Sequence, residues 1–148
     1  MLIIRPLEEP ELAALLRLYE HLHANDEPPS PEASVRAWRE LLANPRHWHL
    51  GAFSEGELVS GCALTVIPNL TRGGRPYGVI ENVVTHAAHR RQGLGKRVLA
   101  EALSIAWSLQ CYKVMLATGR RDEAVTRFYV SAGFKPNEKQ AFVARPEA

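Results

Sequence analysis

The stretch from residue 77 to residue 117 limits the possible folds more than any other part of this sequence. Tyr77–Thr85 is rich in β-branched and apolar residues and predicts a strand. Gly93–Gln110 repeats apolar residues at helical spacing, and Tyr112–Ala117, apolar apart from Lys113, predicts a second, buried strand. A strand, a helix and a strand in this order predict two parallel strands joined by a right-handed crossover.

The other segments predict antiparallel strands and further helices. His47–Ser54 and Glu57–Ile67 flank Glu55-Gly56, which is typical of a hairpin turn. Three more strands are expected: Leu2–Arg5, a strand that begins at Phe134, and Gln140–Val143. Three more helices are expected: one after Pro10, one after the capping residue Ser30, and one over Asp122–Ala132. The fold class expected is therefore α+β (α/β mixed), with one mixed, mostly antiparallel twisted sheet of about six to seven strands and helices on both faces. Trp38, Trp48 and Trp107 fall at apolar positions and are expected in the core.

Length and composition indicate one soluble domain spanning residues 1–148. The chain is 46% hydrophobic and 23% charged, and its net charge of +2 gives no reason to expect nucleic acid or membrane binding. It contains no apolar run near the roughly 20 residues of a membrane span, and charge and proline follow the first residues too soon for a signal peptide. The two cysteines, Cys62 and Cys111, suggest a reducing compartment, so a cytoplasmic location is expected. His47 and His49 share a strand face, but no cluster of further ligands completes a metal site, so none is expected.

The start of the helix after Thr85 carries an unusual concentration of positive charge. Its cationic residues are Arg90, Arg91, Lys96 and Arg97, and the nearest acidic residues are Glu81 and Glu101. Cations are ordinarily unfavourable at a helix N-terminus, by about 0.3–1 kcal/mol each, so a bound anion would reverse the balance. Gly93 and Gly95 would let a phosphate approach the backbone N–H groups. A Walker A loop is excluded because Arg90 occupies a position where that motif requires glycine. A dinucleotide-binding fingerprint is excluded because Val98 occupies the position of its last glycine.

The loop Arg90-Arg91-Gln92-Gly93-Leu94-Gly95 resembles the coenzyme A pyrophosphate loop of the GNAT superfamily of acyl-CoA-dependent N-acetyltransferases. A second signature of that family resembles Ala124, Phe128-Tyr129 and Gly133-Phe134, and the element order also agrees with the family. The resemblance implies acetyl-CoA as co-substrate, contacted by Val83, Val84, Thr85, Arg90, Arg91, Gln92, Gly93, Leu94, Gly95, Lys96, Arg121, Ala124 and Phe128. Arg121 stands where many members have a cofactor-binding asparagine, and with Arg120 it could meet the phosphates instead.

Acetyl transfer to an amine needs a base for the ammonium, a donor for the thioester oxygen and a proton for the leaving thiolate. The resemblance makes Tyr129 the candidate acid and Glu81, in the apolar run Val79–Val84, the candidate base. It also makes the backbone N–H of Val83 or Val84 the donor to the thioester oxygen. The alternatives are that Tyr129 is a core aromatic beside Phe128 and that Glu81 forms a structural ion pair with a nearby arginine.

The acceptor is expected to be a primary amine of a small molecule or peptide. The candidate acceptor-side residues are His23, Asn25, Asp26 and Asn82, and the alternative for the first three is a solvated helix end. Strand alternation places Asn82 on the face opposite to Glu81, where it could brace the loop instead. A non-catalytic acyl-CoA-binding module on the same fold is the second hypothesis. Members of the family often dimerise, so the resemblance is compatible with a homodimer.

Overall fold

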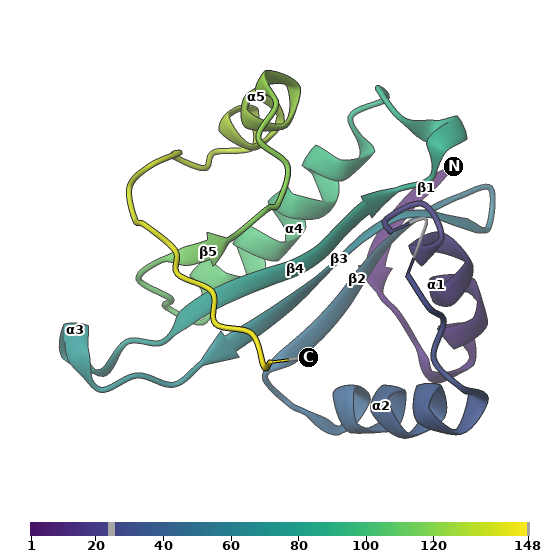
Figure 1. Ribbon diagram of the computed structural model, residues 1–148, viewed down its shortest axis with the longest axis horizontal. Helices are drawn as coiled ribbons and strands as arrows, with labels where there is room; N and C mark the ends of the chain where they lie inside the picture. The colour runs from purple at the N-terminus through teal and green to yellow at the C-terminus, as the bar shows by residue number, and fades with distance from the viewer. Residues whose placement is uncertain (24–25, 148) are drawn as a thin grey trace. The chain divides into compact units, whose positions relative to one another are not determined.

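The structure, a computed structural model, describes residues 1–23 and 26–147 (Figure 1). The chain divides into two compact units, Met1–Leu116 and Ala117–Ala148. The first unit contains the whole sheet, and the second contains helix α5, Glu123–Ser131. The single domain over residues 1–148 stays a prediction.

The first unit is built on one sheet in the order β1-β2-β3-β4-β5. Its strands are β1 (Leu2–Pro6), β2 (His47–Ser54), β3 (Glu57–Ile67), β4 (Tyr77–Thr85) and β5 (Val114–Leu116). The first three pairs are antiparallel and the pair β4–β5 is parallel. The predicted mixed, mostly antiparallel sheet and the crossover between parallel strands are therefore confirmed.

The predicted number of strands is wrong, because the sheet has five strands and not six to seven. Residues 134–147 contain turns and irregular backbone but no strand. Pro136 has no N–H to donate to a ladder, and Asn137 takes a left-handed φ of 63°. The apolar residues after Gly133 are thus interrupted before they can form a strand of ordinary length.

The last strand, β5, is also shorter than predicted. It pairs with β4 only from Gly78–Val114 to Ile80–Leu116, and its three residues are half-buried. A fully buried strand was expected from its apolar sequence. Within the described residues β5 has a sheet neighbour on one side only, which explains the partial exposure.

Three of the four helices of the first unit lie where the sequence signals predicted, and the short helix α3 (Thr71–Gly74) falls in a segment where no helix was expected. The other three are α1 (Leu12–Tyr19), α2 (Pro31–Ala43) and α4 (Leu94–Ser108). The Ser30 hydroxyl accepts a hydrogen bond of 3.1 Å from the Ala33 N–H, and Pro31 stands at the first helical position of α2. Of the helices in the described part of the chain, none has the length and hydrophobicity to span a bilayer. The cytoplasmic location stays a prediction.

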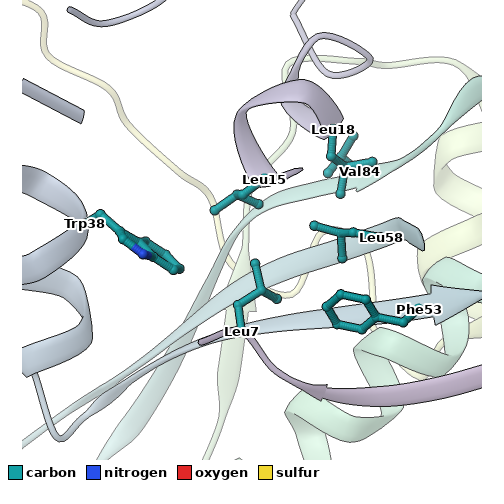
Figure 2. Packing of buried hydrophobic residues seen from close by; sticks show 7 residues of the cluster. All are labelled: Leu7, Leu15, Leu18, Trp38, Phe53, Leu58 and Val84. Atoms are coloured by element: carbon teal, nitrogen blue, oxygen red, sulfur yellow. The ribbon is translucent and has the colours of Figure 1, made fainter. Parts of the chain in front are cut away.

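The sheet carries helices on both faces, as predicted (Figure 1). Helices α1 and α2 cover one face, where a buried cluster brings together side chains from the helices and strands (Figure 2). Helix α4 packs against the other face through a stripe with four-residue spacing that includes Val98, Ala102 and Ala106. Trp38 is 3% exposed, but the core position expected for Trp107 is wrong, because its side chain is 51% exposed beside that stripe.

Candidate functional site

The loop between β4 and α4 leaves the start of α4 open. Arg91 has a φ of 65° and Gly93, the N-cap residue, has a φ of 76°. No side chain caps the helix, and Arg97 makes the first bond of the ladder by donating 3.1 Å to the Gly93 carbonyl. The N–H groups of residues 94–96 precede this bond, so helix geometry gives them no intrahelical acceptor. A Cβ on Gly93 would have nothing within 4 Å, so the backbone is accessible at this point.

The cations of this loop are left without carboxylate partners. None of the ion pairs formed by the described residues includes Arg90, Arg91, Lys96 or Arg97. Arg91, Lys96 and Arg97 are exposed. The loop therefore combines open N–H groups with uncompensated positive charge, which suits an anion such as a diphosphate.

Arg90 has a different role, because its guanidinium holds the loop in place. It donates to the Thr85 carbonyl at 3.2 Å and to the His21 carbonyl at 3.1 Å. The Ala87 N–H donates to Nδ1 of His21 at 3.3 Å, and the rings of His21 and His86 lie 4.0 Å apart. Sequence reasoning missed His21 because this contact joins residues 66 positions apart.

Strand β4 has one edge that β5 covers only in part. Pairing with β5 ends at Ile80, so β5 does not reach the segment from Glu81 to Thr85. The His86 N–H donates 2.8 Å to the Val59 carbonyl, and the Ser60 hydroxyl donates 3.0 Å to the Val84 carbonyl. The backbone groups of residues 84 and 86 therefore face β3. Strand alternation directs the N–H groups of Val83 and Thr85 to the other edge.

A β-bulge interrupts β4 at Asn82. Asn82 has a φ of 55°, and the register shifts between Gly61–Val84 and Ala63–Glu81. Two residues, Asn82 and Val83, thus oppose the single residue Cys62. The expectation that Glu81 and Asn82 point to opposite faces is wrong, because both line the same pocket. The extra residue breaks the alternation on which that expectation depended.

This pocket is called the acceptor pocket below because it contains Asn82, one of the residues expected on the acceptor side. It has a volume of about 370 Å³ and lies between α1, α2 and strands β2 to β4. Tyr19 lines it and hydrogen-bonds to the Asn82 side chain. Burial raises the pKa of Tyr19 to about 12, against the lowering effect of Asn82. Tyr19 is therefore a neutral phenol at physiological pH, fixed beside the bulge.

Two histidines of β2 form a second polar wall of the acceptor pocket. His47 Nε2 lies 2.7 Å from His49 Nδ1, and His47 Nδ1 lies 2.8 Å from the Thr65 hydroxyl. The Trp38 ring meets His49 edge-on at 5.1 Å. Burial lowers the pKa of His47, and burial followed by the neighbouring His47 lowers the pKa of His49 to about 4. The shared face of the two histidines was visible in the sequence, but not the pocket.

The other predicted acceptor-side residues lie elsewhere or outside the description. His23 and Asp26 are exposed and do not line the acceptor pocket. Asn25 lies outside the described residues. In the described part of the chain, no group of three or more His, Cys, Asp or Glu side chains could hold a metal ion.

In the second unit, the turn after α5 explains the Gly133-Phe134 signature. Gly133 has a φ of 102°, and the N–H groups of Gly133 and Phe134 donate 3.0 Å to the carbonyls of Val130 and Tyr129. These two bonds form a Schellman motif, in which glycine is favoured. The Tyr129 ring packs between Phe128, at 4.9 Å, and Phe134, at 6.0 Å. Asp122 caps the helix by accepting 3.0 Å from Val125.

The comparisons with known proteins agree with these features. Residues 12–134 match the model of the acetyltransferase (GNAT) family. A glucosamine 6-phosphate N-acetyltransferase of Trypanosoma brucei brucei is 32% identical over 142 residues, covering 93% of this chain and 91% of that protein. A glucosamine 6-phosphate N-acetyltransferase 1 of Oryza sativa subsp. japonica is 34% identical over 136 residues, covering 88% and 79%.

The chain also resembles a solved structure from Agrobacterium tumefaciens str. C58 that is named as an acetyltransferase. The two superpose with a TM-score of 0.92 at 40% sequence identity, over 97% of this chain and 99% of the other. The family match includes the open loop before α4, the bulged strand and the helix that carries Tyr129. The chain belongs to the acetyltransferase (GNAT) family.

Proposed function

We propose that this N-acetyltransferase moves an acetyl group from acetyl-CoA to a primary amine of a small molecule or peptide. The observation that carries the proposal is the start of α4, which is uncapped and surrounded by cations without ion-pair partners. The N–H groups around Gln92–Lys96 would hold the diphosphate of coenzyme A, with Arg91 neutralising its charge.

The open edge of β4 supports the next part of the proposal. The pantetheine arm would lie along Val83, Val84 and Thr85. Because the Val84 carbonyl and its N–H face β3, the N–H that polarises the thioester oxygen would be that of Val83. Removing one such donor in other enzymes costs about 2.7–4 kcal/mol.

Glu81 is the proposed general base. Its side chain is exposed and lines the acceptor pocket, so it can reach an ammonium directly or through a water molecule. Acetyl-CoA supplies the activated acetyl group, and its carbon–sulfur bond breaks as the bond to the acceptor nitrogen forms. The proton lost by the amine goes to Glu81 or to water held by it.

Tyr129 is the proposed general acid, which returns a proton to the leaving thiolate. A phenol with a pKa near 10 can protonate a thiolate whose conjugate acid is near 8.5 at a modest cost. The assignment depends on the family resemblance, as do the cofactor contacts of Arg121, Ala124 and Phe128. The packing of Tyr129 between two phenylalanines supports a fixed position for its ring.

Two relatives are named glucosamine 6-phosphate N-acetyltransferases, so D-glucosamine 6-phosphate and D-glucosamine are the first acceptors to assay. The homodimer and the absence of nucleic acid binding stay predictions.

The test combines binding and turnover on the full chain. Titration calorimetry should detect acetyl-CoA, and Arg91→Ala should weaken that binding about tenfold, while Arg17→Ala on the exposed side of α1 should not change it. Tyr129→Phe should lower kcat by about 10²–10⁴ with little change in acetyl-CoA affinity. The absence of heat with acetyl-CoA, or a crystal structure with the diphosphate elsewhere, would refute the proposal. Unchanged kcat in Tyr129→Phe would remove the acid role alone.

A further inference from the structure

The acceptor pocket has a row of three residues across its floor that belong to three neighbouring strands. His49 of β2 pairs with Ala63 of β3, and Ala63 pairs with Glu81 of β4. Residues directly opposite one another in a sheet share a face, so the three side chains point into the same pocket. All three line it.

The row leaves a gap of defined width. Neighbouring strands are about 4.8 Å apart, which puts the backbones of His49 and Glu81 about 10 Å apart. The side chain between them is the methyl group of Ala63. Subtracting one carbon radius at each wall leaves about 6 Å. This spacing corresponds to one sugar ring or one aliphatic chain, and the Ala63 side chain at its floor is 5% exposed.

His49 has one ring nitrogen available at this gap. Its Nδ1 is engaged by His47, and none of the hydrogen bonds of the described residues uses its Nε2. No buried side-chain nitrogen or oxygen of the described residues lacks a partner, so Nε2 of this half-buried ring retains some exposure, and the residue lines the pocket. One of the two imidazoles donates in the 2.7 Å contact and the other accepts, so His49 presents either an N–H or a lone pair.

The charge of the acceptor pocket is the remaining observation. Among the described residues that line the pocket, Glu81 alone carries a formal charge at neutral pH, and none is a lysine or arginine. Burial keeps both His47 and His49 uncharged by lowering their pKa values. The residues outside the description, Ala24, Asn25 and Ala148, are not basic either. The charge of the described lining therefore favours an ammonium group, and it includes no cation that could pair with a phosphate.

We propose that the acceptor is a compact primary amine without a phosphate or other anionic group. It lies over Ala63, between Glu81 and His49. His49 distinguishes acceptors by a hydrogen bond to a hydroxyl of the acceptor next to its amine. The inference rests on the proposed function, because it assigns the acceptor of that reaction. The proposed acceptor thus differs from the phosphorylated substrate in the names of the two relatives described above.

The first test compares D-glucosamine with D-glucosamine 6-phosphate, which differ only in the phosphate. The value of kcat/KM should be at least about tenfold higher for D-glucosamine, because a dianion meets only the negative Glu81. An equal or higher kcat/KM for the phosphorylated amine would overturn the proposal.

The second test uses variants of the row. Ala63→Leu should fill the gap and lower kcat/KM for D-glucosamine by about 100-fold while acetyl-CoA affinity, measured by calorimetry, stays within about twofold. Ala100→Leu on the exposed side of α4 is the matched control. His49→Asn should raise KM for D-glucosamine about five- to tenfold with a smaller effect on kcat, as for one lost hydrogen bond. Wild-type kinetics in both row variants would overturn the proposal.

Binding separates this inference from the proposed function. If no amine is acetylated, calorimetry with the CoA-saturated protein should still show D-glucosamine binding that Ala63→Leu abolishes, so the proposed function would fail and the site would stand. Absence of D-glucosamine binding in that complex would overturn the site. Acetylation of D-glucosamine with no effect of Ala63→Leu would overturn the site and leave the proposed function intact.

Discussion

The half-buried His49 of the acceptor pocket should make the stability of the protein depend on pH. The pKa of a histidine is ordinarily 6.5, and that of His49 is lowered in the folded chain to about 4. Between these two pH values the ring is protonated in the unfolded chain and neutral in the folded chain. The stabilising contribution is complete above pH 6.5 and is lost as the pH falls toward 4. A shift of this size corresponds to about 3 kcal/mol. Because water reaches a half-buried ring, we expect about 2 kcal/mol at pH 4.5.

Urea unfolding at pH 7.5 and pH 4.5 measures this contribution in the wild type and in His49→Asn. The loss of unfolding free energy between the two pH values should be about 2 kcal/mol larger in the wild type, equivalent to about 4–8 °C in Tm. Titrating carboxylates affect both proteins equally, so the difference between them isolates the contribution of His49 together with its coupling to His47. His23→Gln, which replaces an exposed histidine, should behave like the wild type. Equal acid sensitivity of the wild type and His49→Asn would refute the reasoning.

Three further predictions concern single residues. Gly61→Ala should lower the free energy of unfolding by about 1–3 kcal/mol, because the new Cβ would lie 2.8 Å from the Leu50 carbonyl oxygen; urea titration measures it, and an unchanged midpoint would contradict the packing. Gly93→Ala should cost about 1–2 kcal/mol through its φ of +76° alone, since the surrounding space is open; a larger loss would mean that the site is crowded. Glu81→Gln should lower kcat by about 10²–10⁴ and remove the acidic limb of the pH–rate profile, and a retained limb would assign the base elsewhere.

Local signals predicted the parts of the fold that local interactions determine. Ser30 and Pro31 marked the start of α2, and Glu55-Gly56 marked the hairpin, where both residues take positive φ values. The strand–helix–strand order required the parallel pair β4–β5 for topological reasons. The first two features depend on residues that are close in the sequence, and the third depends on the order of the elements.

Features that depend on distant partners could not be predicted in the same way. The bulge at Asn82 has no glycine to mark it, so strict alternation assigned the wrong face. The contact between His21 and Ala87 joins the turn after α1 to the loop before α4, and sequence spacing contains no information about it. Trp107 shows the limit of hydrophobic pattern alone, because a large apolar side chain can stand beside a buried stripe and remain exposed.

The bulge in β4 also means that the sheet and the site can be altered independently. Asn82 is the extra residue of the bulge. Val84 pairs with Gly61 and Thr85 pairs with Ser60, and the same pairs would form in a regular ladder in which β4 was one residue shorter. Removing Asn82 altogether would therefore preserve every downstream pairing, while straightening the strand and taking away the polar group that holds Tyr19. Removing a residue of β4 outside the bulge, which is formed by Asn82 and Val83, would instead turn the following side chains over. The strand therefore tolerates a change of length at the bulge and nowhere else along its paired segment.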